Sequence, residues 1–180
     1  SWLSLWLKNL NSHVLGVSLD IPTTPSHYSS IGLKNDIRNE FVNIRDLTKL
    51  KKIFRKFKPD FVFHLAAQSL VKRSYLNPEL TFNTNSIGTL NVMECLRETK
   101  KNCVAVIITS DKSYKNEEIK RGYKENDILG GVDPYSASKA SAELIIDSYF
   151  ESFLKYKKNL RIGVARAGNV IGGGDWSENR

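Results

Sequence analysis

Val104-Ala105-Val106-Ile107-Ile108 is an uninterrupted apolar run with no polar face. A strand that is covered by helices on both sides has this pattern, because neither of its faces meets water. Further short apolar runs lie at residues 14–19, 60–66 and 160–165, and the central run extends over 103–109. Their lengths are typical of strands, so they predict four strands of a buried sheet.

Helical patterns separate these runs. Apolar side chains recur at helical spacing within residues 47–57, and long helical stretches begin at Pro78 and at Tyr135, extending to about residues 101 and 156. Strands that alternate with helices indicate βαβ units, a parallel sheet and right-handed crossovers. We therefore expect a Rossmann-like, doubly wound α/β fold, with residues 1–180 forming one partial NAD(P)-binding domain.

Polar or small residues follow each apolar run, at the strand ends where parallel sheets bind ligands. Asp20 ends the first run, and an acidic side chain there can accept hydrogen bonds from an adenosine ribose. Ala66-Ala67 follows the second run and would let a flat cofactor approach the backbone closely. Ser110-Asp111-Lys112 and Gly168-Asn169 follow the other two. Ordinary turn chemistry explains any one of these, but four together favour a binding site.

Tyr135 and Lys139 are four residues apart and therefore share one face of the predicted helix. Free tyrosine titrates near ~10 and is a poor base at neutral pH. A neighbouring ammonium stabilises the phenolate, so the pair could remove a proton from a substrate hydroxyl while hydride leaves the same carbon. Tyrosine and lysine are common surface residues and often fall at this spacing by chance. The polar residues at the four strand ends are the reason to interpret them as a catalytic pair.

Several motifs occur in a fixed order along the chain. They are His64-Leu65-Ala66-Ala67-Gln68-Ser69, Thr109-Ser110-Asp111-Lys112, Tyr135-x-x-x-Lys139 and Arg166-Ala167-Gly168-Asn169. This set resembles the extended short-chain dehydrogenase/reductases that act on nucleotide sugars. Within that family, Ser18-Leu19-Asp20, the loop at 130–136 and the ending Gly168-Asn169-Val170-Ile171-Gly172-Gly173-Gly174-Asp175-Trp176 are most similar to the CDP-glucose 4,6-dehydratases.

The resemblance implies NAD as cofactor, a nucleotide sugar such as CDP-glucose as substrate and a homo-oligomer for the complete enzyme. The cofactor contacts that it implies are Asp20, Asn43, Ile44, Leu65, Ala66, Ala67, Gln68, Ser69, Thr84, Tyr135 and Lys139. It also implies that Ser110 and Asn169 contact the substrate, whereas Asn85 is expected to tie its helix to the preceding strand rather than to touch a ligand.

The chemical roles follow from the same resemblance. Tyr135 would remove the O4 proton of the sugar with the help of Lys139, Ser110 would align O4, and Asp111 would protonate the departing C6 hydroxyl. Lys112 lies where related dTDP-glucose dehydratases carry a glutamate as the C5 base. A lysine can act as that base only when neutral, so an orienting cation or a salt bridge is the alternative role.

Two other interpretations of the function remain open. A nucleotide-sugar epimerase or reductase would share Tyr135 and Lys139 but would need no acid and base for C5 and C6. The resemblance also implies a glycine-rich phosphate loop before Ser1 and a substrate-binding portion after Arg180, so we expect the chain to be an internal segment, and a noncatalytic binding module is the third possibility.

Composition argues against nucleic-acid binding, a disulfide framework and a metal site. The chain has 27 basic and 19 acidic residues, a formal net charge of +8. Much of the excess lies in residues 49–58, where apolar side chains hold one helix face and the lysines and arginines are expected on the solvated face rather than against nucleic acid. The two cysteines and three histidines show no disulfide or metal-ligand spacing, and no secretory segment is evident, so we expect a cytoplasmic protein without a catalytic metal.

Overall fold

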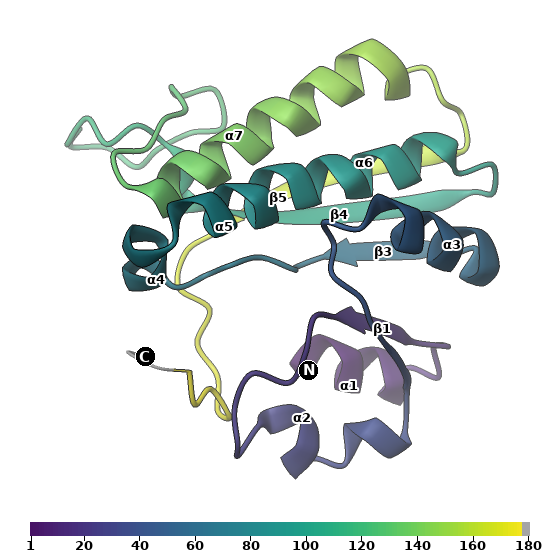
Figure 1. Cartoon of the computed structure of the whole chain (residues 1–180). Coiled ribbons are helices and arrows are strands. Elements are labelled where there is room, and N and C mark those ends of the chain that lie inside the picture. Colours follow the sequence, from purple (N-terminus) through teal and green to yellow (C-terminus); the bar gives the residue numbers. More distant parts are fainter. Residues whose placement is uncertain (178–180) are drawn as a thin grey trace. The chain divides into compact units, whose positions relative to one another are not determined.

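The computed structural model describes residues 1–177, and these form two compact units. The first unit contains Ser1–Asn43 and the segment that begins at Val170, and the second contains Ile44–Asn169. Figure 1 shows the elements of both units along the chain. The five strands of the described residues all pair in parallel. The expected Rossmann-like α/β fold with parallel sheets is confirmed.

The first unit is built around two parallel strands, β1 (Leu15–Ser18) and β2 (Arg38–Phe41). Helix α1 (Trp2–Asn9) precedes β1, and the short helix α2 (His27–Ser30) lies between the strands in the chain. Ser26 caps α2, because its side chain accepts a hydrogen bond from the backbone N–H of Ser29. This cap ends the proline-containing loop that follows β1.

The second unit contains a three-stranded parallel sheet in the order β3-β4-β5. The strands are β3 (Phe61–His64), β4 (Cys103–Ser110) and β5 (Leu160–Ala167). Thr109 lies opposite Arg166 in the register of β4 and β5. The carboxyl ends of all three strands therefore meet at one edge of the sheet.

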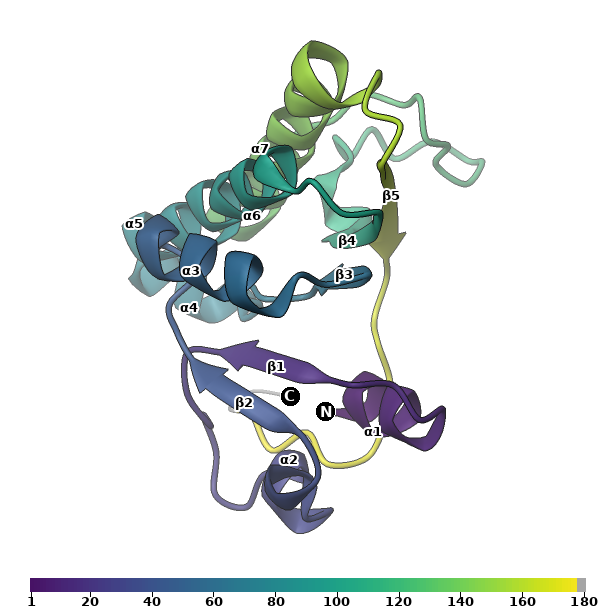
Figure 2. The ribbon, with the colours of Figure 1, turned by 90° about the vertical axis from the view of Figure 1, so that its right-hand side faces the viewer.

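Helices of the second unit cover one face of this sheet. They are α3 (Leu47–Phe57), α4 (Val71–Leu76), α5 (Pro78–Phe82), α6 (Gly88–Glu98) and α7 (Pro134–Tyr149). Figure 2 shows α3, α6 and α7 on the same side of the strands. Asp133 caps α7 by accepting from the backbone N–H of Ser136, and Pro134 occupies the first turn, where its missing N–H costs nothing.

The core of the second unit lies between the sheet and these helices, where Met93, Leu96 and Ile107 are almost completely buried. On β4, the side chains that face the helices are buried, but Val104 on the opposite face is 38% exposed. The prediction that β4 is buried on both faces is therefore wrong, because the helices of this unit cover only one face of the sheet. Cys95 and Cys103 are both free and buried.

The four predicted strands are present, with boundaries shifted by one to two residues at most of their ends. The pattern missed β2, α2 and α4, all of which are short. The long helix expected from residue 78 is divided by a π-helical turn at Asn83–Ile87. The assignment of residues 1–180 to a single domain stays a prediction. None of the helices within residues 1–177 is both long enough and apolar enough to cross a membrane.

Candidate active site

The first turns of α7 bury both members of the predicted acid/base pair. Tyr135 is 9% exposed and Lys139 is 8% exposed. The Nζ of Lys139 donates to the carbonyl oxygen of Ile108 on β4 at 3.5 Å, which directs the ammonium toward the carboxyl end of that strand. Burial lowers the pKa of Lys139, and the carboxylate of Glu143, one turn further along α7, opposes this shift.

A tight turn at the end of β4 presents the other predicted catalytic residues. The hydroxyl of Ser110 donates to Oδ1 of Asp111 at 3.1 Å and accepts from the backbone N–H of Lys112 at 3.2 Å. Ser110 therefore caps the turn, while its side chain remains beside the carboxylate. Asp111 and Lys112 are both exposed, so any partner for them in the reaction must come from bound substrate or from groups beyond this turn.

Lys112 also acts on the start of α7. Burial alone would raise the pKa of Asp133, but hydrogen bonds from Ser136 and the backbone, together with the positive charge of Lys112, hold it below its usual value. The lysine charge thus lies within electrostatic range of the residue that caps the helix carrying Tyr135. The choice between a base and an orienting cation for Lys112 stays open.

Asn85 joins the segment after β3 to the catalytic helix. Its side-chain oxygen accepts from the backbone N–H of Gln68 at 2.8 Å, and its Nδ2 donates to the Gln68 carbonyl at 3.0 Å and to Oγ of Ser138 at 2.9 Å. Ser138 directly precedes Lys139 on α7. Asn85 is 1% exposed, so it has the structural role expected from the sequence.

The π-helical turn that contains Asn85 also sets the protonation state of His64. The hydroxyl of Thr89 donates to the Asn85 carbonyl at 2.7 Å, so its oxygen is left to accept from Nε2 of His64, 3.0 Å away. Nε2 of His64 therefore carries a proton. Burial, reinforced by the positive charge of Lys139, lowers the pKa of His64 to about 4.

The second unit brings most of the predicted site residues to one edge of its sheet. Leu65, Ala66, Ala67, Gln68 and Ser69 follow β3, Ser110, Asp111 and Lys112 follow β4, and Gly168 and Asn169 follow β5. Thr84 lies in the π-helical turn, and Ile44 is buried against Gly88 at the start of α6. Asp20 and Asn43 belong to the first unit.

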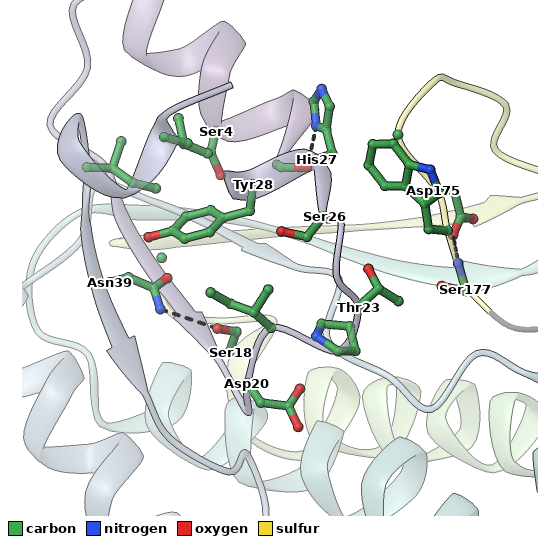
Figure 3. A pocket seen from close by; sticks show the side chains of 18 of the residues that line it. Ser4, Ser18, Asp20, Thr23, Ser26, His27, Tyr28, Asn39, Asp175 and Ser177 are labelled. Carbon is green, nitrogen blue, oxygen red and sulfur yellow. Dashed lines mark hydrogen bonds between the residues drawn. The ribbon is translucent and has the colours of Figure 1, made fainter. Parts of the chain in front are cut away.

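The first unit has a pocket of about 320 Å³ at the carboxyl end of β1, lined by polar and apolar residues alike (Figure 3). Ser18 and Asp20 line it, and Asn39 of β2 donates from Nδ2 to the Ser18 hydroxyl at 3.3 Å. Asp20 is exposed at the strand end. A carboxylate and hydroxyls at this place match the hydrogen-bonding groups of a ribose, so the residues present fit the adenosine half of a dinucleotide.

A partly buried ion pair beside the predicted site was not anticipated from the sequence. Glu143 of α7 accepts hydrogen bonds from both Nε and Nη2 of Arg166 on β5, at 2.9 and 3.1 Å. It also accepts one from the hydroxyl of Thr109 on β4. The available signal was the position of Glu143, eight residues after Tyr135 and four after Lys139 on the same helix face. Its partner lies on a strand 23 residues further along the chain.

Comparison with known protein families places the chain. A family model described as GDP-mannose 4,6 dehydratase matches residues 11–163. The chain belongs to this family. The CDP-glucose 4,6-dehydratase of Salmonella typhimurium is 44% identical over 184 residues, which cover all of this chain and 51% of that enzyme.

Solved structures of other proteins share the fold. A UDP-glucose 4-epimerase from Thermotoga maritima, determined with UDP-glucose, superposes with a TM-score of 0.76 at 22% identity over 92% of this chain and 50% of its own. A dTDP-glucose 4,6-dehydratase from Streptomyces venezuelae, determined with NAD, gives a TM-score of 0.71 at 23% identity over 91% of this chain and 51% of its own. The chain thus spans about half the length of these proteins.

Proposed function

We propose that the full-length protein carrying this chain is a nucleotide-sugar 4,6-dehydratase that converts CDP-glucose to its 4-keto-6-deoxy product. The observation that carries the proposal is the turn at Ser110-Asp111-Lys112, which places an acid and a possible base at the strand edge beside buried Tyr135 and Lys139. The 44% identity to a CDP-glucose 4,6-dehydratase supports this substrate over other nucleotide sugars.

NAD is the cofactor that this function requires. When bound, it supplies the site that accepts hydride from C4 and returns it to C6. The residues that would hold it are Asp20, Asn43, Ile44, Leu65, Ala66, Ala67, Gln68, Ser69, Thr84, Tyr135 and Lys139. The donor and acceptor set of the first-unit pocket fits the ribose, and the NAD-bound dehydratase of the same fold supports this choice.

The α7 pair would carry out the first proton transfer. Tyr135 removes the proton from O4 of the sugar, and the Ser110 hydroxyl, buried at the end of β4, aligns that oxygen. Lys139, held through the Ile108 carbonyl, places its positive charge near the phenol and so stabilises the phenolate that accepts the proton. Asn169 would contact the substrate from the end of β5.

The β4 turn would carry out the elimination. A ketone at C4 makes the C5 hydrogen acidic, so a base can remove it while an acid protonates the departing C6 hydroxyl. Asp111 is the acid in this scheme and Lys112 the base. Lys112 is exposed in the chain as described, so the covering that a neutral lysine needs would come from bound substrate and the remaining part of the enzyme.

Substrate preference gives the most direct test. With NAD added, the full-length enzyme is expected to form a 4-keto-6-deoxy product from CDP-glucose faster than from dTDP-glucose or GDP-mannose. Side-by-side mass spectrometry at equal substrate concentrations measures the three rates. A clear preference for another nucleotide would move the assignment to a sister dehydratase, and C4 inversion without loss of water would move it to the epimerases.

A further inference from the structure

The Glu143–Arg166 pair is partly buried and has a defined geometry. The Glu143 side chain is 7% exposed and that of Arg166 is 18% exposed, and their contact is bidentate. Bidentate guanidinium–carboxylate pairs fix orientation as well as distance. A buried ion pair is a weak source of stability, because removing both charges from water offsets much of their attraction. The main effect of the Glu143–Arg166 pair is therefore to fix the positions of the segments that it joins, rather than to stabilise the fold.

Glu143 connects the two elements that carry the proposed chemistry. It lies one turn after Lys139 on α7, and it accepts a hydrogen bond from the hydroxyl of Thr109, the residue directly before Ser110-Asp111-Lys112. The carboxylate therefore sets the distance between the start of the β4 turn and the helix face that carries Tyr135.

Arg166 holds the chain on the far side of the same turn. Its Nη1 donates to the carbonyl oxygen of Glu125 at 2.9 Å, and its guanidinium lies over the ring of Tyr114, 4.6 Å from the ring centre. Tyr114 is the second residue after Lys112, and it pairs with Leu129 to close the base of the 115–128 loop. The turn is thus held from both ends by one ion pair.

Both partners face the cavity that Asp111 faces. A cavity of about 1010 Å³ in the second unit is lined by Asp111, Tyr114, Glu143 and Arg166 among others. This volume is at the upper end of that typical for small-molecule sites. The cavity reaches the proposed catalytic turn at Asp111, whereas Lys112, Tyr135 and Lys139 are not among its lining residues.

We propose that Glu143 and Arg166 are positioning residues that hold Asp111 and Lys112 in register with Tyr135 and Lys139, so that elimination can follow C4 oxidation. This inference rests on the proposed dehydratase function. It assigns the pair a selective effect: loosening it displaces Asp111 and Lys112, which serve elimination alone, more than Tyr135 and Lys139, which serve oxidation. Ser110 of the same turn aligns O4, so a small slowing of C4 oxidation is expected as well. A misplacement of about 1 Å can slow a reaction step about 100-fold.

The test uses Arg166→Lys in the full-length enzyme, because lysine keeps the charge but loses the planar fork and the stacking on Tyr114. Single-turnover absorbance is expected to show C4 oxidation within about threefold of wild type and elimination slowed about 10-fold to 100-fold. Hydrogen exchange is expected to be faster in residues 109–129. Glu143→Gln, which keeps the shape and removes the charge, should give the same pattern.

Arg97→Lys is the matched control, since Arg97 also makes a bidentate pair with a glutamate, Glu94, and lies 5.6 Å over an aromatic ring, that of Phe153. It should leave both steps and the exchange of residues 109–129 unchanged. Unchanged exchange in Arg166→Lys and Glu143→Gln, or equal slowing of oxidation and elimination, would overturn the positioning role. If the wild-type enzyme forms no 4-keto-6-deoxy product, the proposed function fails, and the exchange measurement alone decides whether the pair orders the turn.

Discussion

Replacing Tyr135 by phenylalanine should suppress reduction of the cofactor from the first turnover, whereas Lys112→Ala should permit that reduction and delay the elimination. Tyr135 is proposed to act before the ketone exists, and Lys112 only afterwards. Removal of a general acid or base commonly slows a step by about 10²–10⁴-fold. In a single turnover followed by stopped-flow absorbance of reduced nicotinamide, Lys112→Ala is expected to accumulate the signal and Tyr135→Phe to show none.

Lys112→Arg separates the two roles left open for this lysine. Arginine keeps a positive charge but does not become neutral at any working pH, so it cannot serve as a base. If Lys112 is the base, Lys112→Arg should be as slow in elimination as Lys112→Ala. If it is a cation that orients a hydroxyl, Lys112→Arg should recover most of the rate.

Lys115→Ala is the control for loss of an exposed positive charge near the same turn, since Lys115 is paired with the loop residue Glu117. It should leave both phases unchanged. A Lys112→Ala enzyme that fails at C4 oxidation as completely as Tyr135→Phe would contradict the proposed base and assign Lys112 to orientation or cofactor binding.

Acid should destabilise the fold through His64. Its pKa is lowered to about 4 in the folded state, so the unfolded chain, with a histidine pKa near ~6.5, binds the extra proton first as pH falls. The contribution of the neutral His64 ring to the free energy of unfolding is present in full above pH ~6.5. It is lost progressively as the pH falls from ~6.5 to ~4. The difference in pKa corresponds to a loss of about 3 kcal/mol.

His64→Gln removes this titration while keeping a donor that can reach Thr89. The free energy of unfolding of wild type relative to His64→Gln should fall by about 3 kcal/mol between pH 7 and pH 4, measured by urea denaturation. His13→Gln, at an exposed histidine, should retain the wild-type loss. A directly titrated ring pKa near 6.5, measured by NMR, would show that His64 is not held neutral.

The features of this structure that could be predicted from the sequence are those with a local, periodic pattern of residues. The apolar run of β4, the spacing of Tyr135 and Lys139, and the polar residues at strand ends are all local signals. Strand β2 was missed because Arg38 and Glu40 interrupt its apolar pattern and pair with each other on one side of the strand. Such a short, charged strand is recognisable only once β1 lies beside it.

The remaining features depend on partners far apart in the chain. Glu143 could be placed on a helix face, but its pairing with Arg166 and Thr109 arises only when α7 packs on β4 and β5. The bonds of Asn85 to Gln68 and Ser138 likewise join three separate segments. Helical spacing indicates that such side chains are buried without saying what they meet.

The π-helical turn at Asn83–Ile87 joins α5 to α6, and the number of residues in it decides which side chains reach the segment after β3. Thr81 bonds to the Gln68 side chain, Asn85 to the Gln68 backbone and Thr89 to His64, so three residues spaced four apart reach one neighbouring segment. In a regular helix, side chains four apart drift steadily around the axis, and the wider turn corrects that drift. A homologue or a designed variant that lost a single residue here would gain a more regular helix, and one end of this row of side chains would rotate away from its partners. Insertions and deletions should therefore be excluded from this stretch. Substitutions on its outer face should be tolerated.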